Sequence, residues 1–320
     1  MERRKIIIDV DTGTDDAVAI MLAATHRELE LVAVTTVNGN VPLEQTTDNT
    51  LRVLEWIGRQ DIPVYAGMSK PIAREDFPTP RALKRDTKVH MPVLTLPEAT
   101  GKKQSLSAPQ FLVNAFSSDP TMTLVAVAPL SNIAAAIAMD PCFASNVSEL
   151  MIMGGGVFRP NMTAAAEFNV WADPEAAAVV FSAGFKKITM IPLDATHQAT
   201  ITEDECAKLR ALGTPSGRAA ADFIEFRINA YKVNAAGGPV PDGAPVHDAL
   251  CIAALIDRSV IETRHLNVVV ETKGEFTVGC TVVDHLKITK REPNCDVAFD
   301  ADKEKFFEFM HSTFSQAATR

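Results

Sequence analysis

Length, composition and charge set the first limits on this chain. It has 320 residues, of which 47% are hydrophobic and 22% are charged, so it can bury a large core and has the composition of an ordinary globular protein. Its net charge of −9 argues against nucleic acid or an anionic membrane as its main partner.

The cysteines and the N-terminus indicate the compartment. Five cysteines, an odd number without a C-x-x-C pair, argue against a disulfide framework and favour a reducing environment. The apolar run before Asp9 is only three residues long, which is too short for a signal peptide. Because no run approaches the roughly 18 apolar residues of a membrane span, we predict a cytoplasmic protein.

Strand-like and helix-like segments alternate along the first two thirds of the chain. Apolar, β-rich runs predict strands at 5–10, 29–37, 123–128, 149–154 and 187–193. Helical patterns begin just after Asp15 and also cover 42–58, 107–117, 131–139 and 174–182. This alternation predicts an α/β fold, an open, mostly parallel Rossmann-like sheet with helices on both faces.

Two helix starts carry strong signals. Asp173 precedes Pro174 as a helix cap would, and Thr202 with Glu205 forms a capping-box pattern.

The segment 69–104 is rich in proline and polar residues, which predicts a long excursion over the surface.

The alternation of strand-like and helix-like segments ends near residue 260. Two apolar runs around Lys273 and Gly274 predict a hairpin, followed by a strand at 295–302 and a closing helix at 302–315. We therefore expect a small antiparallel C-terminal addition. Since no linker divides the chain, we predict a single domain over 1–320.

Four aspartates are concentrated in "IIIDVDTGTDDAVAI", residues 6–20: Asp9, Asp11, Asp15 and Asp16. In an open parallel sheet, ligands bind at the carboxyl ends of the strands, where this strand, turn and helix start would meet. Clustered carboxylates repel one another unless a cation joins them, and oxygen ligands suit Ca²⁺ or Mg²⁺. As an alternative, Asp15 could be a helix cap and Asp9 a structural residue of the turn.

A further carboxylate could complete such a site. The segment "APVHDALCIAAL", residues 244–255, places His247 and Asp248 at the start of an apolar helix. Taken alone, this pattern favours a capping aspartate beside a surface histidine. Only its combination with the first cluster indicates a metal site.

The motifs together carry a family resemblance. "DVDTGTDDA" is similar to the D-x-D-x-x-x-D-D opening of the inosine–uridine preferring nucleoside hydrolases. Further segments resemble the family in family order: "TTVNGN", "VAVAPLSNIA", "MGGGV", "AEFNVWADPEAA", "PLDATH", "VHDAL" and "CDVAFDADKEKFFEF". The resemblance covers essentially the full chain.

The resemblance implies a calcium-dependent hydrolysis of ribonucleosides to free base and ribose. One Ca²⁺ would be held by Asp11, Asp16, Asp248 and the backbone carbonyl of Val127, with the ribose 2′- and 3′-hydroxyls and a water completing its shell. Asp11 matches the general base that activates the attacking water. The partner would be a small-molecule ribonucleoside, and the chain would form a homodimer or homotetramer.

The resemblance also assigns the sugar and base contacts. Asp15 matches the residue that binds the 2′-hydroxyl, and Met153 matches one that packs against the ribose. His247 matches a histidine that helps protonate the leaving base in part of the family. The positions that would hold the sugar hydroxyls are Asn40, Asn161, Glu167 and Asn169.

Two positions depart from the family pattern. Thr12 stands where the family usually has proline, and threonine also fits a turn. At 89–97, "VHMPVLTLP" replaces a glycine-rich segment of the pocket mouth, which leaves the base preference and any role of His90 open. Tyr231 could also reach the base.

Three other functions compete with hydrolysis. "DVDTGT" also resembles the opening of haloacid-dehalogenase phosphatases, in which Asp9 would be a nucleophile at a Mg²⁺ site. A non-catalytic nucleoside or ribose binder on the same scaffold is the second alternative. A structural calcium-binding protein is the third.

Overall fold

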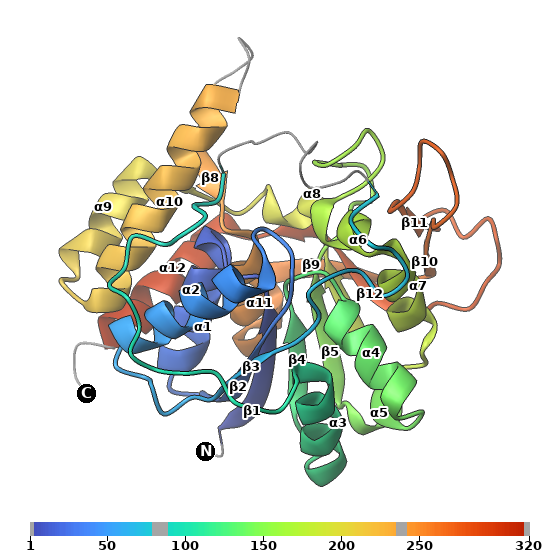
Figure 1. The fold of residues 1–320 in the computed structure, drawn as a ribbon. Coiled ribbons are helices and arrows are strands. Elements are labelled where there is room, and N and C mark those ends of the chain that lie inside the picture. Colours follow the sequence, from blue (N-terminus) through green and yellow to red (C-terminus); the bar gives the residue numbers. More distant parts are fainter. Residues whose placement is uncertain (1–2, 79–88, 235–241, 317–320) are drawn as a thin grey trace.

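The computed structural model describes residues 3–78, 89–234 and 242–316. Its centre is an eight-stranded sheet with the order β3-β2-β1-β4-β5-β6-β12-β9. The strands are β1 (Arg4–Val10), β2 (Leu29–Thr36), β3 (Val64–Ala66), β4 (Thr123–Ala126), β5 (Glu149–Met153), β6 (Ile188–Ile191), β9 (Ile261–Leu266) and β12 (Cys295–Ala301). All neighbours pair in parallel except β9, which runs antiparallel to β12. The predicted Rossmann-like sheet is confirmed (Figure 1).

Helices cover both faces of this sheet. One face carries α1 (Thr14–Thr25), α2 (Leu43–Trp56), α10 (Pro215–Asn234), α11 (His247–Ile256) and α12 (Lys303–Gln316). The other carries α3 (Ala108–Ser118), α4 (Ser131–Met139) and α7 (Pro174–Ser182). Side chains alternate along β1, so Ile6 and Ile8 enter the first core and Ile7 the second. This explains why "KIIIDV" is apolar at consecutive positions.

The predicted helix starts are confirmed in atomic detail. The Asp173 carboxylate accepts a hydrogen bond from the Ala176 amide at 3.1 Å at the start of α7. Thr202 and Glu205 form the expected capping box before α9 (Glu203–Ala211). The sequence did not predict several elements of three to six residues: β3, α5 (Phe143–Asn146), α6 (Phe168–Ala172), α8 (Leu193–Thr196), β7 (Thr200–Thr202), β8 (Gly243–Pro245), β9 and the 3-10 helix η2 (Arg258–Val260). They are too short to show a period in the sequence.

The C-terminal part contains the expected hairpin. β10 (Val268–Val270) pairs antiparallel with β11 (Thr281–Val283). The strand predicted at 295–302 is β12, which joins the main sheet beside β6 instead of the hairpin. The predicted surface excursion at 69–104 has neither helix nor strand in its described part, and residues 79–88 lie outside the described residues. Among the helices of the described ranges, none has the length and apolar character needed to cross a membrane.

The strand order determines where a ligand can bind. The chain leaves β1 for α1 on one face of the sheet, and it leaves the adjacent β4 for α4 on the other face. The two connections diverge and leave a crevice beyond the carboxyl ends of these strands. Asp11 follows β1 and Val127 follows β4 at this crevice. The Val127 amide donates to the Asp9 carbonyl at 2.9 Å, which keeps the two strand ends together.

Candidate active site

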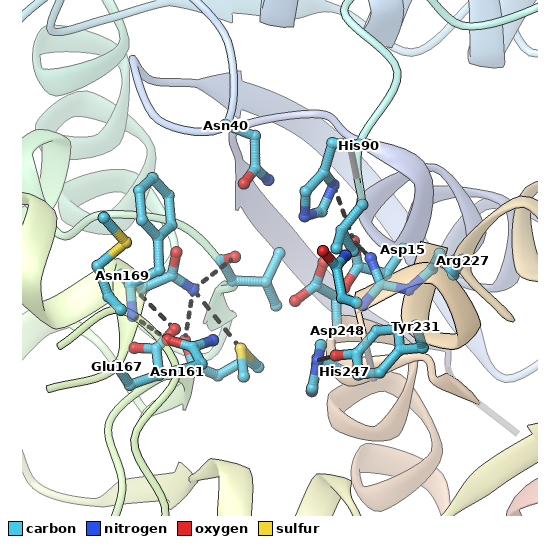
Figure 2. Close-up of a pocket in the computed structure, with 16 residues that line it drawn as sticks. Asp15, Asn40, His90, Asn161, Glu167, Asn169, Arg227, Tyr231, His247 and Asp248 are labelled. Atoms are coloured by element: carbon cyan, nitrogen blue, oxygen red, sulfur yellow. Dashed lines mark hydrogen bonds and ion pairs between the residues drawn. The ribbon is translucent and has the colours of Figure 1, made fainter. Parts of the chain in front are cut away.

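A cavity of about 360 Å³ lies at the carboxyl ends of the strands. Its volume is in the range of small-molecule sites. Figure 2 shows carboxylates, an arginine and histidines on one side of it, and Asn161, Glu167 and Asn169 on the other. The predicted residues that line it are Asp15, Asn40, Val127, Met153, Asn161, Glu167, Asn169, His247 and Asp248. The predicted ligands Asp11 and Asp16 do not line the cavity.

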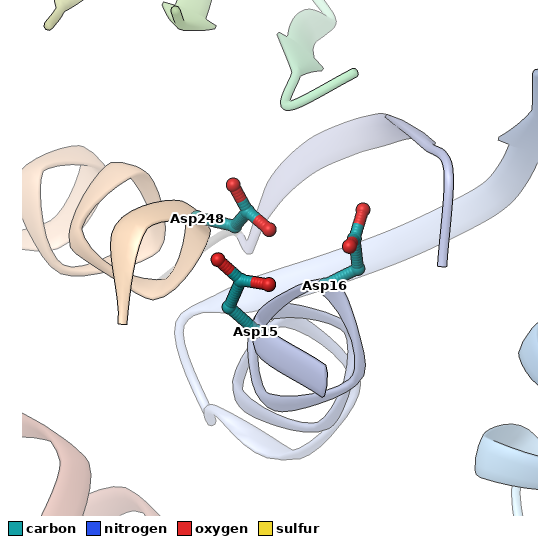
Figure 3. Close-up of side chains that lie close together, drawn as sticks. All are labelled: Asp15, Asp16 and Asp248. Atoms are coloured by element: carbon teal, nitrogen blue, oxygen red, sulfur yellow. The ribbon is translucent and has the colours of Figure 1, made fainter. Parts of the chain in front are cut away.

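Three carboxylates meet beside this cavity. Asp15 and Asp16 open α1 and Asp248 belongs to the first turn of α11, and oxygens of all three lie within 4.8 Å of one another (Figure 3). Asp15, which the sequence assigned to the sugar, thus joins the cluster in which Asp11 was expected. Asp11 lies next to it, because its backbone amide donates to Asp16 Oδ1 at 3.1 Å.

The carboxylates have little compensation from the protein. Burial raises the pKa of Asp16 to about 7, and the charge of Asp15 adds to this shift. Burial and the neighbouring carboxylates also raise the pKa values of Asp11 and Asp248. Asp11 Oδ1 is buried without a hydrogen-bond partner. Among the described residues, the permanent cation paired with this group is Arg227, on Asp15.

Asp9 has a different environment from the other three aspartates of its segment. It is fully buried and accepts hydrogen bonds from the Thr35 hydroxyl at 2.5 Å and the Asn132 amide at 2.8 Å. Burial raises its pKa to about 7. It does not line the cavity. Asp9 therefore has the contacts of a structural residue, and a phosphatase would lack its exposed nucleophile.

The opposite side of the cavity is fixed by backbone and amide contacts. Glu167 caps α6 and accepts hydrogen bonds from the amides of Asn169 at 2.9 Å and Gly155 at 2.8 Å. Burial nevertheless raises the pKa of Glu167 to about 7. The Asn169 side chain donates to the carbonyls of Val127 and Met153, both at 3.1 Å. These polar groups are held in place before any ligand arrives.

His247 lies at the rim between the carboxylates and α10. Its Nδ1 is 2.7 Å from the Thr196 hydroxyl, and its Nε2 is 3.3 Å from the Tyr231 hydroxyl. Burial lowers the pKa of His247 well below its usual value, and the charge of Arg227 adds to this effect, which favours the neutral imidazole. His197 stacks edge-on at 5.4 Å between ring centroids. His197, which is half-buried, is therefore a packing partner of the site.

The divergent segment 89–97 forms part of the cavity wall. The side chain of Asn49 donates to the Pro92 carbonyl at 3.3 Å and accepts from the Leu94 amide at 3.2 Å, and Leu94 is buried. His90 lines the cavity, with Nδ1 3.6 Å from Asp15 Oδ1. A Cβ on Gly13 would lie 2.2 Å from His90 Nδ1, so a larger residue at this turn would displace the His90 ring. The segment is thus attached to α2 and presents His90 to the ligand.

Sequence reasoning did not identify Arg227 as a site residue. It lines the cavity with only 1% of its surface exposed. One signal could have found it, because Arg227 precedes Tyr231 by four residues and so shares its helix face. Asn234, the last residue of α10, lies on the same side and also lines the cavity.

The comparison with protein families fits this geometry. Residues 6–308 match the model of the inosine–uridine preferring nucleoside hydrolases. The chain belongs to this family. This nucleoside hydrolase is accordingly an N-ribohydrolase, an enzyme class that acts on small-molecule nucleosides.

Curated relatives extend over nearly the whole nucleoside hydrolase chain. It is 39% identical over 308 residues to the pyrimidine-specific ribonucleoside hydrolase RihA of Shewanella woodyi, with 96% of each chain covered. It is 38% identical over 310 residues to the pyrimidine-specific ribonucleoside hydrolase RihB of Escherichia coli O157:H7, again with 96% of each covered. The predicted family is therefore confirmed.

Solved structures share the fold. The purine-preferring ribonucleoside hydrolase of Gardnerella vaginalis superimposes with a TM-score of 0.89 at 29% identity, covering 98% of this chain and 99% of the other. The plant nucleoside hydrolase PpNRh1 gives a TM-score of 0.87 at 29% identity, with the same coverage.

Proposed function

We propose that this enzyme hydrolyses the N-glycosidic bond of ribonucleosides in a calcium-dependent reaction. The observation that carries the proposal is the set of buried, uncompensated carboxylates beside a cavity whose other side presents fixed amides. Such a site can bind a cation and a polyhydroxylated ligand together.

The residues fit a calcium ion. All the groups that meet here offer oxygen, which is the ligand type that Ca²⁺ prefers, and the buried Asp11 Oδ1 has no hydrogen-bond partner. We propose Asp11, Asp16, Asp248 and the Val127 carbonyl as the ligands. Asp15 belongs to the same carboxylate group, but its charge is already paired with Arg227. We therefore assign Asp15 to a sugar hydroxyl and not to the ion.

Hydrolysis then follows from the residue types around the cavity. When bound, the ion supplies positive charge that holds the ribose hydroxyls and makes a water molecule easier to deprotonate. Asp11 accepts the proton of the water that attacks C1′. As the bond to the base breaks, positive charge develops at C1′, and the surrounding carboxylate and amide oxygens stabilise it.

The ribose is held by groups on both sides of the cavity. Asp15 binds the 2′-hydroxyl, and Met153 packs against the ring. The remaining hydroxyls contact Asn40, Asn161, Glu167 and Asn169. Because Asp15 is buried and held by Arg227, a sugar without the 2′-hydroxyl leaves this carboxylate without its hydroxyl donor, which lowers the rate.

The leaving base receives its proton from the histidine side of the cavity. Because its lowered pKa favours the neutral form, His247 must take up a proton before it can donate one, and the charge of Asp15 favours that uptake. In the protonated form Nδ1 donates to the Thr196 hydroxyl. The Nε2 hydrogen then points toward Tyr231 and the cavity. We propose the imidazolium form of His247 as the proton donor, which returns to neutral imidazole when Nε2 gives its proton to the base, with Tyr231 orienting it and His90 as the next candidate.

We further propose that the preferred substrates are pyrimidine ribonucleosides. The supporting observation is identity of 38–39% to hydrolases named pyrimidine-specific, against 29% to the solved enzyme named purine-preferring.

A homodimer or homotetramer is also proposed. Exposed apolar side chains at Phe276, Leu286 and Ile288 offer a surface for such an assembly, and sedimentation would measure it.

A reducing-sugar assay tests the proposed function. The enzyme is incubated with uridine, cytidine, inosine, adenosine and guanosine, first with calcium and then with a chelator. The proposal expects free ribose from uridine and cytidine, with the reaction abolished by the chelator and restored by calcium. Binding of ribonucleosides without ribose release would instead indicate a non-catalytic binder.

A further inference from the structure

Arg227 is the most deeply buried cation of the cavity wall. Only 1% of its surface is exposed, although it lies on α10 at the edge of the cavity (Figure 2). Arginine is almost never fully buried unless it is paired, because desolvating its charge is costly. Its position therefore depends on specific partners.

Those partners come from two different parts of the chain. Nη1 lies 2.9 Å from Asp15 Oδ1 and donates to the Thr14 hydroxyl at 3.3 Å. Nε donates to the Pro245 carbonyl at 3.1 Å. The planar guanidinium fixes these directions relative to one another. Arg227 thus connects the start of α1 to β8, the strand just before His247 and Asp248.

The contact with Asp15 opposes a repulsion. Asp15 lies within 4.8 Å of the carboxylates of Asp16 and Asp248, and like charges at this distance push the Asp15 side chain away. His90 is another basic group nearby, with Nδ1 3.6 Å from the same oxygen. Arg227 is closer, is always charged, and is anchored at Pro245.

We propose that Arg227 is a positioning residue that holds the Asp15 carboxylate in the orientation that receives the ribose 2′-hydroxyl. The inference rests on the proposed function, in which Asp15 binds that hydroxyl. Arg227 acts through Asp15 and not on the reacting atoms. Removing it therefore weakens the discrimination between ribose and 2′-deoxyribose more than it weakens cleavage itself.

The kinetic test compares Arg227→Gln, Asp15→Asn and the double variant on uridine and 2′-deoxyuridine. We expect R227Q to reduce the ratio of kcat/KM on uridine to kcat/KM on 2′-deoxyuridine at least about tenfold. This is the effect of losing one hydrogen bond between the 2′-hydroxyl and a charged carboxylate. D15N should then reduce the ratio little further in the R227Q background. Arg227→Lys should restore part of it. Equal loss on both substrates, with independent effects of the two substitutions, would overturn the inference.

A matched control and a structure separate this inference from the proposed function. Arg210 also pairs with carboxylates, Asp222 and Glu225, but on the surface of α9, so Arg210→Gln should leave the ratio unchanged. If the wild-type enzyme released no ribose from either substrate, the proposed function would fail by itself. A crystal structure of R227Q then decides: a reoriented Asp15 carboxylate supports the inference, and an unmoved one overturns it.

Discussion

The two ends of the central sheet treat buried carboxylates in opposite ways. At the amino end of β5, Glu149 is paired with Arg4 at 2.5 Å, with Lys187 at 3.2 Å and with Arg258. Burial raises its pKa, but the three cations outweigh burial and bring the pKa to about 2. At the carboxyl end, burial raises the pKa of Asp16 to about 7.

Pairing with cations thus distinguishes Glu149 from the buried aspartates at the carboxyl end, where the pKa values of Asp9, Asp11 and Asp16 are all raised. Strand β1 contributes to both ends, with Arg4 at its first residue and Asp11 just after its last. At the carboxyl end Arg227 is paired with Asp15 alone. We propose that a bound cation compensates Asp11, Asp16 and Asp248, whose carboxylates also repel one another.

The largest expected effect comes from Asp248→Asn. If Asp248 is a metal ligand, the substitution should lower kcat/KM roughly 10³-fold or more, since a bound metal supplies several kcal/mol of transition-state stabilisation. It should also abolish the rise in Tm on adding calcium. In chelator the variant should be more stable than the wild type near pH 7, because a carboxylate whose pKa is raised by burial opposes folding when ionised. If the variant were less stable than the wild type in chelator, the carboxylates at the carboxyl end would not be uncompensated as we describe them.

His247→Ala should have the next largest effect. We expect kcat on natural nucleosides to fall roughly 10²–10⁴-fold, the usual range for general acid catalysis. p-Nitrophenyl riboside needs no proton on its leaving group and should lose much less activity, while calcium affinity stays nearly constant. An equal loss on both substrates would mean that His247 maintains the shape of the site and donates no proton.

Fold and chemistry were predictable from the sequence to different degrees. Long periodic segments such as 131–139 and 174–182 were predicted to the residue, because their apolar pattern and caps are local. The motifs also identified most of the residues that line the cavity. The spacing of Arg227 and Tyr231 indicates only a shared helix face, and the contact of Arg227 with Asp15 depends on how α10 packs against α1. The same holds for Asp15, whose neighbours depend on the packing of α11 on α1.

The sugar contacts predict a smaller effect. Uridine should be hydrolysed at least about tenfold faster than 2′-deoxyuridine, since losing a hydrogen bond to a charged group costs on the order of 1.5–3 kcal/mol. Asp15→Asn should reduce this preference. Equal kcat/KM values of the wild-type enzyme on the two substrates would show that the cavity residues at the carboxyl ends of the strands do not recognise the 2′-hydroxyl.

Glu149→Gln, at the other end of the sheet, should affect stability alone. We expect a loss of roughly 1–3 kcal/mol at pH 7 with unchanged kcat/KM, because hydrogen bonds to charged groups are removed far from the cavity. The folded pKa of about 2 lies below the ordinary 4.5, so this contribution is complete above pH 4.5 and disappears as the pH falls toward 2. Denaturation of both proteins across this pH range measures it. A constant difference down to pH 2 would exclude the proposed ion pairs as its source.

The most direct test of the uncompensated carboxylates is a crystal structure of the wild-type enzyme grown with calcium, with anomalous scattering to identify the ion. Our account predicts one Ca²⁺ per chain, bound by Asp11, Asp16, Asp248 and the Val127 carbonyl. Crystals without an ion among these residues, together with full ribose release in the presence of a chelator, would contradict it.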